Sequence, residues 1–185
     1  SLTVVEGLGE GGAVRKKAKI TGVPHGYKTQ EFPFGEKKML CATIPWGDVS
    51  TAWYSTQIPN IEVYISVTPS MLRGMKMGNY LGWFLSTSFM QNYLKAKVNA
   101  RKPGPDEQER KAGYSILYGE VKNEKGETRS AGMKTPEGYT LTAATAVNIA
   151  EKVLNGNFKT GFQTPSLAYG ADLILETAGT KRYDL

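Results

Sequence analysis

Cysteine and histidine are nearly absent from this chain of 185 residues, which contains only Cys41 and His25. A single cysteine cannot form an internal disulfide, and a structural zinc site needs four cysteine or histidine ligands. A disulfide framework is therefore excluded, and a Cys/His zinc centre nearly so. A Ser–His–Asp or Cys–His catalytic site would have to use His25, which follows a proline in a basic loop where we expect it to be exposed. The composition fits a reducing compartment, and we expect a cytoplasmic protein.

Long apolar runs are also missing. Residues 77–93 carry no formal charge, but the stretch is short for a bilayer crossing and polar side chains interrupt it. No charged segment followed by an apolar stretch opens the sequence, which begins with Ser1, so no signal peptide is expected. We expect the chain to be part of a longer polypeptide or a processed product.

Nucleotide-binding motifs are absent as well. No G-x-G-x-x-G follows a strand and opens a helix, and no G-x-x-x-x-G-K-[ST] occurs. The glycine-rich stretch at residues 7–12 has no buried strand before it, which argues against a phosphate site. The net charge of +6 permits contact with nucleic acid, anionic lipid or a phosphorylated cofactor but selects none of them. The basic run at residues 15–19 lacks interleaved aromatics, so we interpret it as a solvated hairpin face and expect no nucleic-acid partner.

What remains is the composition of an ordinary folded domain, with 40% hydrophobic and 22% charged residues. Glycine-centred turns and alternating apolar residues predict strands, and apolar spacings of three and four residues predict helices. The expected strands lie at residues 13–23 (a hairpin), 27–44 (two strands joined at Gly35 and Glu36), 61–68 and 113–135 (a hairpin). The expected helices lie at residues 51–55, 69–98, 140–155 and 166–176. This order predicts an α+β fold with a mixed, largely antiparallel sheet covered by helices on one face.

The helix at residues 140–155 carries a regular apolar stripe. Such a stripe predicts a helix over these residues. Its members are Ala143, Ala146, Val147, Ala150, Val153 and Leu154.

The segment at residues 69–98 has small residues every four positions, at Gly74, Gly78 and Gly82. This spacing lets another backbone approach closely, so we expect a helix buried against a sheet or a partner helix. The aromatic residues of the segment are expected in the core; they are Trp83, Phe84 and Phe89. The alternative is a membrane-associated segment over residues 71–96.

Two stretches carry a family resemblance. The first reads IPWGDVSTA at residues 44–52 and continues as IPNIEVY at 58–64. The second reads TPEGYTLT at 135–142 and continues as GFQTPSLAYGAD at 161–172. In these motifs the chain resembles the C-terminal half of the saccharopine dehydrogenase-like oxidoreductases, the family that also includes the trans-acting enoyl reductase-like proteins.

The resemblance implies a split architecture, in which an N-terminal Rossmann domain binds NAD or NADP and a second α+β domain faces the cofactor cleft and often dimerises. Residues 1–185 would be that single C-terminal, substrate-facing and dimerisation domain, with the Rossmann half absent from this chain. The expected partners are the missing Rossmann domain and a second copy of the chain. The cofactor, NAD or NADP, would be bound in the full-length protein and not by this chain alone, so the isolated chain is not expected to catalyse hydride transfer.

The two motif stretches also supply candidate substrate-binding residues. A turn that leaves a sheet edge and a polar loop that opens a helix can both present side chains to a cleft. Helix capping by Asp48 or Thr164 and a core position for Trp46 are the structural alternatives. We assign no catalytic or metal-binding residue. The candidates are Trp46, Asp48, Tyr54, Gln163, Thr164 and Tyr169.

Two other classes of function stay open from the residues alone. One is a binding or scaffold module, with membrane association through residues 71–96. The other is an independent enzyme, which ranks last because no complete catalytic constellation is visible.

Overall fold

The protein is described by a computed structural model that covers residue 5, residue 7 and residues 10–35, 37–100 and 104–185. It has the predicted α+β fold, and all strands pair antiparallel. The strands form three small sheets, in the orders β1-β2, β3-β4-β5 and β6-β7-β8. The contacts within the chain divide it into two compact units. One consists of Ser1–Phe32 and Lys38–Pro103, the other of Pro33–Lys37 and Gly104–Leu185.

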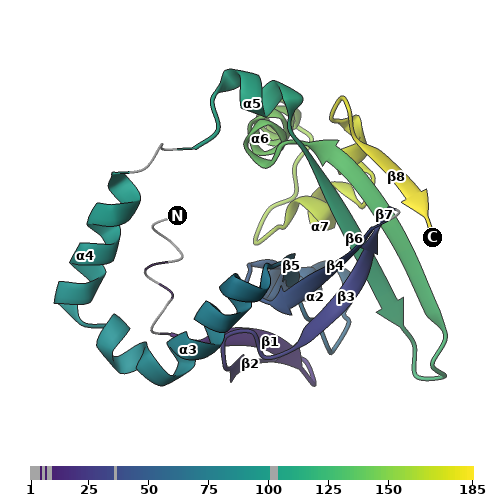
Figure 1. The fold of residues 1–185 in the computed structure, drawn as a ribbon. Coiled ribbons are helices and arrows are strands. Elements are labelled where there is room, and N and C mark those ends of the chain that lie inside the picture. The colour runs from purple at the N-terminus through teal and green to yellow at the C-terminus, as the bar shows by residue number, and fades with distance from the viewer. Residues whose placement is uncertain (1–4, 6, 8–9, 36, 101–103) are drawn as a thin grey trace. The chain divides into compact units, whose positions relative to one another are not determined.

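Within the residues that the structure describes, the first unit contains the strands β1 to β5 and the helices α2, α3 and α4 (Figure 1). The hairpins at both predicted positions are confirmed. Its strands are β1 (Gly12–Lys16), β2 (Lys19–Val23), β3 (Thr29–Phe34), β4 (Lys37–Thr43) and β5 (Tyr64–Ser66). Its helices are α2 (Asp48–Thr56), α3 (Pro69–Leu85) and α4 (Ser88–Asn99). Its buried core is small and includes Val14, Cys41, Ala42, Val49 and Val67.

The second unit is built around the predicted hairpin of β6 (Tyr114–Lys122) and β7 (Thr128–Pro136). A third strand, β8 (Lys181–Asp184), adds to β7 and was not among the expected strands. The helices are α5 (Glu107–Ala112), α6 (Gly138–Leu154), α7 (Pro165–Tyr169) and the 3-10 turn η1 (Leu173–Glu176).

The turn between β1 and β2 has an unusual backbone. Lys17 and Ala18 have φ values of +48° and +63°, a conformation that usually requires glycine or asparagine. Contacts from a later segment hold it: the Lys17 amide donates to Asn60 Oδ1 (3.0 Å) and the Ala18 amide donates to the Pro59 carbonyl (2.8 Å). The left-handed turn is therefore imposed by tertiary contacts rather than by its own residues.

The strand predicted at residues 61–68 is shorter than expected. Ile61 exchanges both backbone hydrogen bonds with Arg15 of β1, whereas regular pairing with β4 is confined to Tyr64–Ser66. Between them, the Val63 carbonyl accepts from the Ile44 amide (2.9 Å). The alternation of side chains is real, but the segment passes from one sheet to the other and so forms only a three-residue strand.

The helix predicted at residues 140–155 is confirmed as α6, and its apolar stripe is exposed. All six residues of the apolar stripe are exposed, and Leu154 is among the most exposed residues of the helix. The opposite face is held by polar contacts, since Asn148 and Lys152 both bind the carboxylate of Glu176 (2.8 and 2.9 Å). These contacts join α6 to η1, which is far from it in the sequence.

Two other segments differ from expectation. Residues 101–112, interpreted as a polar loop, contain α5, which begins with a capping box between Asp106 and Glu109. The helix predicted at residues 166–176 is split into α7 and η1 by Gly170, whose φ of +85° ends α7.

Candidate functional site

The first candidate segment is the turn that leads from β4 into α2. Trp46 is 57% exposed, and Asp48 and Tyr54 are exposed as well. The capping alternative is not confirmed, because Gly47 is the N-cap of α2 and makes no side-chain capping bond. Asp48 instead lies in the first helical turn, where a negative charge suits the helix dipole. The core alternative for Trp46 is also wrong.

Arg15 of β1 holds this helix in place. The residue is only 6% exposed, and its guanidinium donates to the Val49 carbonyl (2.9 Å), the Ser50 carbonyl (3.2 Å) and the Ala18 carbonyl (2.6 Å). It also lies 5.4 Å from the ring centroid of Trp53. Among the described residues no carboxylate lies within ion-pair distance of Arg15. The interpretation of the basic run as a solvated face is therefore wrong for this residue.

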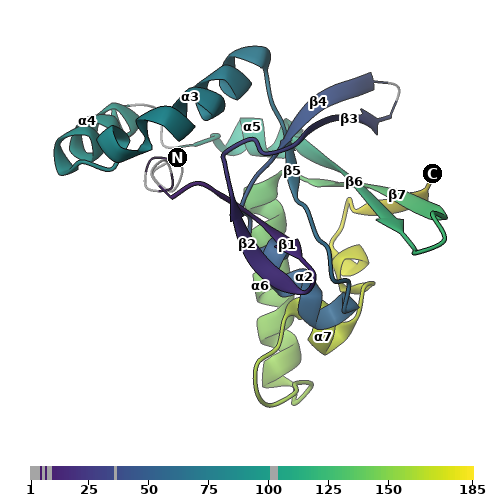
Figure 2. The same cartoon turned by 90° about the horizontal axis from the view of Figure 1, so that it is seen from below.

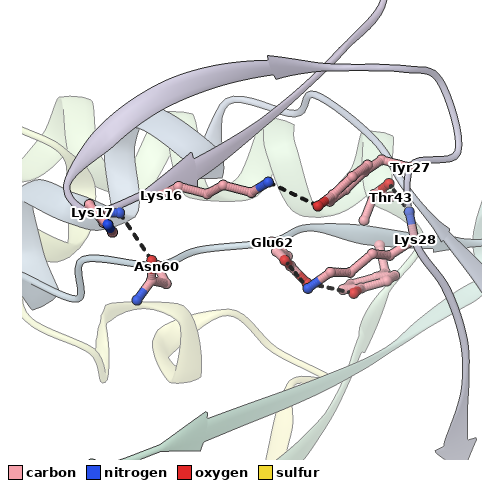
Figure 3. A network of polar contacts seen from close by, with 8 residues as sticks. Lys16, Lys17, Tyr27, Lys28, Thr43, Asn60 and Glu62 are labelled. Atoms are coloured by element: carbon pink, nitrogen blue, oxygen red, sulfur yellow. Dashed lines mark hydrogen bonds and ion pairs between the residues drawn. The ribbon is translucent and has the colours of Figure 1, made fainter.

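A polar network lies beside the same hairpin (Figure 3). Lys16 Nζ donates to the hydroxyl of Tyr27 (2.9 Å), and Lys28 Nζ donates to Glu62 Oε1 (2.5 Å). The Tyr64 hydroxyl donates to the other carboxylate oxygen of Glu62 (2.7 Å). The network thus brings together groups from β1, β5 and the loops beside them, and Glu62 is its only carboxylate.

The protonation of this network follows from its contacts. Burial acts to raise the pKa of Glu62, but the hydrogen bonds from Lys28 and Tyr64 and the charges of Lys28 and Lys16 outweigh it and hold this pKa below its ordinary value. Burial and the adjacent Glu62 carboxylate raise the pKa of Tyr64 above its ordinary value. At neutral pH Glu62 is therefore ionised and Tyr64 is a protonated donor, which suits a structural clamp better than proton transfer.

Glu62→Gln is expected to lower the stability of the first unit by up to about 1 kcal/mol at pH 7, because the Lys28 side chain is half exposed. The carboxylate has a lower pKa in the folded chain than in the unfolded one, so its contribution is present above the ordinary value of 4.5 and is lost as the pH falls through the folded value. Urea unfolding at pH 3, 5 and 7 measures this.

The matched control is Glu31→Gln, on an exposed position of β3. It should unfold like the parent at all three pH values. A Glu62→Gln variant whose deficit is the same at pH 3 as at pH 7 would contradict the proposed role of the charge.

The second candidate segment lines a hollow in the second unit. The cavity has a volume of about 260 Å³, and Gln163, Thr164 and Tyr169 all line it. Its other lining residues are Ile149, Val153, Phe158, Lys159, Gly161, Pro165 and Ala168. The structure thus brings together three of the six sequence-predicted site residues. At about 260 Å³ the hollow is slightly smaller than the roughly 300–1,000 Å³ of common ligand pockets.

Each of the three side chains is positioned by the backbone. Thr164 is the N-cap of α7 and accepts from the Leu167 amide (3.2 Å), which confirms its capping role. The Tyr169 hydroxyl donates to the Asn157 carbonyl (2.9 Å), and Gln163 Nε2 donates to the Thr160 carbonyl (3.1 Å). Gln163 Oε1 is buried and has no hydrogen-bond partner in the described part of the chain. In this conformation the oxygen is closed to solvent, so a ligand donor reaches it only after a lining side chain shifts.

Cysteine and metal chemistry find no support in the structure. Burial raises the pKa of the Cys41 thiol, which is 1% exposed and is therefore no thiolate nucleophile. His25 is half-buried rather than exposed, and its Nε2 has no partner within the described residues. In the part of the chain that the structure covers, no three His, Cys, Asp or Glu residues gather as metal ligands would.

Comparison with protein-family models, with curated proteins and with solved structures finds no match to this chain. Its function is therefore inferred from its own residues and their geometry.

Proposed function

We propose that this chain is the substrate-facing and dimerisation domain of an NAD(P)-dependent oxidoreductase of the saccharopine dehydrogenase-like class. A companion Rossmann domain would hold the NAD or NADP, and this chain would complete the substrate pocket. The α+β order and the two motif stretches at residues 44–64 and 135–172 support the proposal. Hydride chemistry belongs to the nicotinamide, so the contribution of this chain is to bind and orient the substrate.

The observation that carries the proposal is the cavity around Gln163. The motif residues Gln163, Thr164 and Tyr169 line it together, and Gln163 Oε1 is an acceptor without a donor. The donation from Gln163 Nε2 to the Thr160 carbonyl fixes the orientation of the amide, so the end left without a partner is the acceptor oxygen Oε1. Once a lining side chain shifts and opens this oxygen, a substrate N–H or O–H group would donate to it, and the apolar part of the substrate would contact the side chains of Ile149 and Phe158.

The test is to purify the natural assembly, meaning this chain with any segment covalently or tightly bound to it in its own cells. NAD(P)H binding to that assembly is then measured by fluorescence. We expect the natural assembly to bind NAD(P)H with a companion nucleotide-binding segment present, and residues 1–185 alone not to bind it. In the assembly, Gln163→Leu should raise the KM for the reducible substrate by about tenfold or more, because a buried hydrogen bond to the substrate is lost.

Gln108→Leu is the matched control, since Gln108 is exposed on α5, away from the residues that line the cavity. An assembly that binds neither NADH nor NADPH would overturn the proposal. Tight NAD(P)H binding by residues 1–185 alone would do the same, since no companion would then be needed.

A further inference from the structure

The outer face of α3 and α4 is unusually rich in exposed aromatic side chains. Trp83 and Phe89 are each 77% exposed, contrary to the expectation that they lie in the core. Neither helix has a buried side chain, since the only buried position in the two helices is Gly78. We call this set the aromatic face: Arg73, Lys76, Met77, Tyr80, Trp83 and Phe84 of α3, with Phe89, Tyr93 and Lys97 of α4.

The aromatic face of α3 is a single stripe, because its residues recur at intervals of three and four. The inner side of the helix is attached to the rest of the unit. Asn79 exchanges two hydrogen bonds with the backbone of His25 (2.7 and 3.1 Å), and Leu72 and Met75 lie against Gly26. These contacts fix the rotation of α3 and leave the aromatic face outward.

No described segment covers these helices at the glycine positions. A methyl group added at Gly74, Gly78 or Gly82 would meet no atom within 4 Å. The expectation that this spacing lets another backbone approach closely is therefore wrong within the described chain. α3 and α4 follow one another along the chain with a change of direction between them (Figures 1 and 2). Ser86 and Thr87 separate the helices, and the Thr87 side chain caps α4.

The charge of this segment has one sign. The sequence contains no aspartate or glutamate between Glu62 and Asp106. Arg73 and Lys76 belong to the aromatic face of α3, and Lys97 lies 5.0 Å from the ring centroid of Tyr93 on α4. Exposed aromatic and aliphatic side chains beside cations, with no anions, are typical of helices that lie at the surface of an anionic bilayer.

We propose that the aromatic face docks onto the surface of an anionic lipid bilayer, with Trp83 and Phe89 inserted at the level of the headgroups and Arg73 and Lys76 bound to lipid phosphates. This binding is independent of the proposed redox role. Within the described residues no helix is long and apolar enough to span a bilayer, which favours a surface orientation. A second copy of the chain is a less suitable partner for the aromatic face. Two such faces in contact would place cations against cations, with no anion to pair them.

The experiment is sedimentation of residues 1–185 with vesicles of phosphatidylcholine alone and of phosphatidylcholine with 30% phosphatidylserine, in about 0.1 M salt. We expect partitioning to be at least about tenfold stronger on the anionic vesicles and to weaken as salt is added, because each cation near the surface contributes about fivefold. Tryptophan fluorescence should shift to the blue on the anionic vesicles.

Variants separate the two parts of the face. Trp83→Ser with Phe89→Ser should lower partitioning by about a hundredfold, since each buried aromatic side chain contributes about tenfold. The control pair is Tyr139→Ser with Leu154→Ser, both exposed on α6. Arg73→Gln with Lys76→Gln should remove most of the preference for anionic vesicles, whereas Lys19→Gln with Lys125→Gln, at exposed positions elsewhere, should not.

Trp83→Phe distinguishes insertion from a general effect on the fold. It should bind within about twofold of the parent but lose most of the blue shift, because the inserted indole is replaced by a phenyl ring. Equal partitioning onto both vesicle types, or parent-like partitioning by the Trp83→Ser and Phe89→Ser variant, would overturn the proposal. So would a dimer in analytical ultracentrifugation that this variant dissociates, because a second copy would then be the occupant.

Discussion

Replacing Arg15 by leucine is expected to lower the free energy of unfolding of the first unit by about 3 kcal/mol. The buried guanidinium donates to the carbonyls of Ala18, Val49 and Ser50 and lies against Trp53, so its removal takes away three charge-assisted hydrogen bonds and a ring contact at once. Urea unfolding followed by tryptophan fluorescence should show the midpoint falling by about 1.5 M at an unchanged slope of about 2 kcal/mol/M.

Two further variants define what Arg15 contributes. Arg15→Lys keeps the positive charge but cannot donate in three directions at once, so about half of the loss is expected. Lys19→Leu, at an exposed position of the same hairpin, should leave the midpoint nearly unchanged. If Arg15→Leu unfolded at the parent midpoint, the idea that this side chain fastens α2 to the hairpin would be wrong.

Gly132→Ala is expected to destabilise the second unit by about 2 kcal/mol and to release β8 from β7. Gly132 is paired with Tyr183 in the register of these strands, and the ring of Tyr183 lies over the glycine. A methyl group at this position would overlap the ring well inside van der Waals contact, so the strand or the ring must move. Hydrogen exchange of the Lys181–Asp184 amides and thermal unfolding would measure the effect.

The neighbouring strand offers a matched control. Gly119 lies in the interior of β6, and a methyl group there would only reach the Ala131 carbonyl at 4.0 Å, so Gly119→Ala should be neutral or slightly stabilising. Combining Gly132→Ala with Tyr183→Ala should restore part of the lost stability, since the overlap is then removed. Unchanged hydrogen-exchange protection of the β8 amides in Gly132→Ala would show that the Tyr183 ring moves aside without loss of stability.

Local signals in the sequence predicted the hairpins and failed for helix orientation. The turn between β6 and β7 contains Gly126 at a φ of +84°, the conformation for which glycine is favoured. From this turn, β6 and β7 pair in one continuous antiparallel register of nine residue pairs. The inner face of α6, by contrast, is contacted by Glu176, whose carboxylate binds Asn148 and Lys152 from a position beyond the next helix. The spacing of apolar residues along α6 does not reveal these contacts with Glu176.

The candidate site was predicted unevenly for a similar reason. Gln163, Thr164 and Tyr169 lie within one loop and helix, so their convergence on one cavity could be read from a short stretch of sequence. Arg15 was missed because it stands among lysines, and its burial depends on carbonyls of α2 that are distant in the sequence. The one signal in the sequence was an arginine in a run that is otherwise lysine, directly after the buried Val14.

During synthesis, β1 and β2 leave the ribosome before the residues that hold their turn. Lys17 and Ala18 each adopt a left-handed backbone at a cost of about 1 kcal/mol or more, and the hydrogen bonds that offset this cost come from Pro59 and Asn60. We therefore expect the nascent hairpin to stay open until those residues have emerged. Strand closure, docking of α2 and the bridge between Arg15 and Ile61 then occur together, so the N-terminal part of the chain becomes ordered in one late event rather than strand by strand.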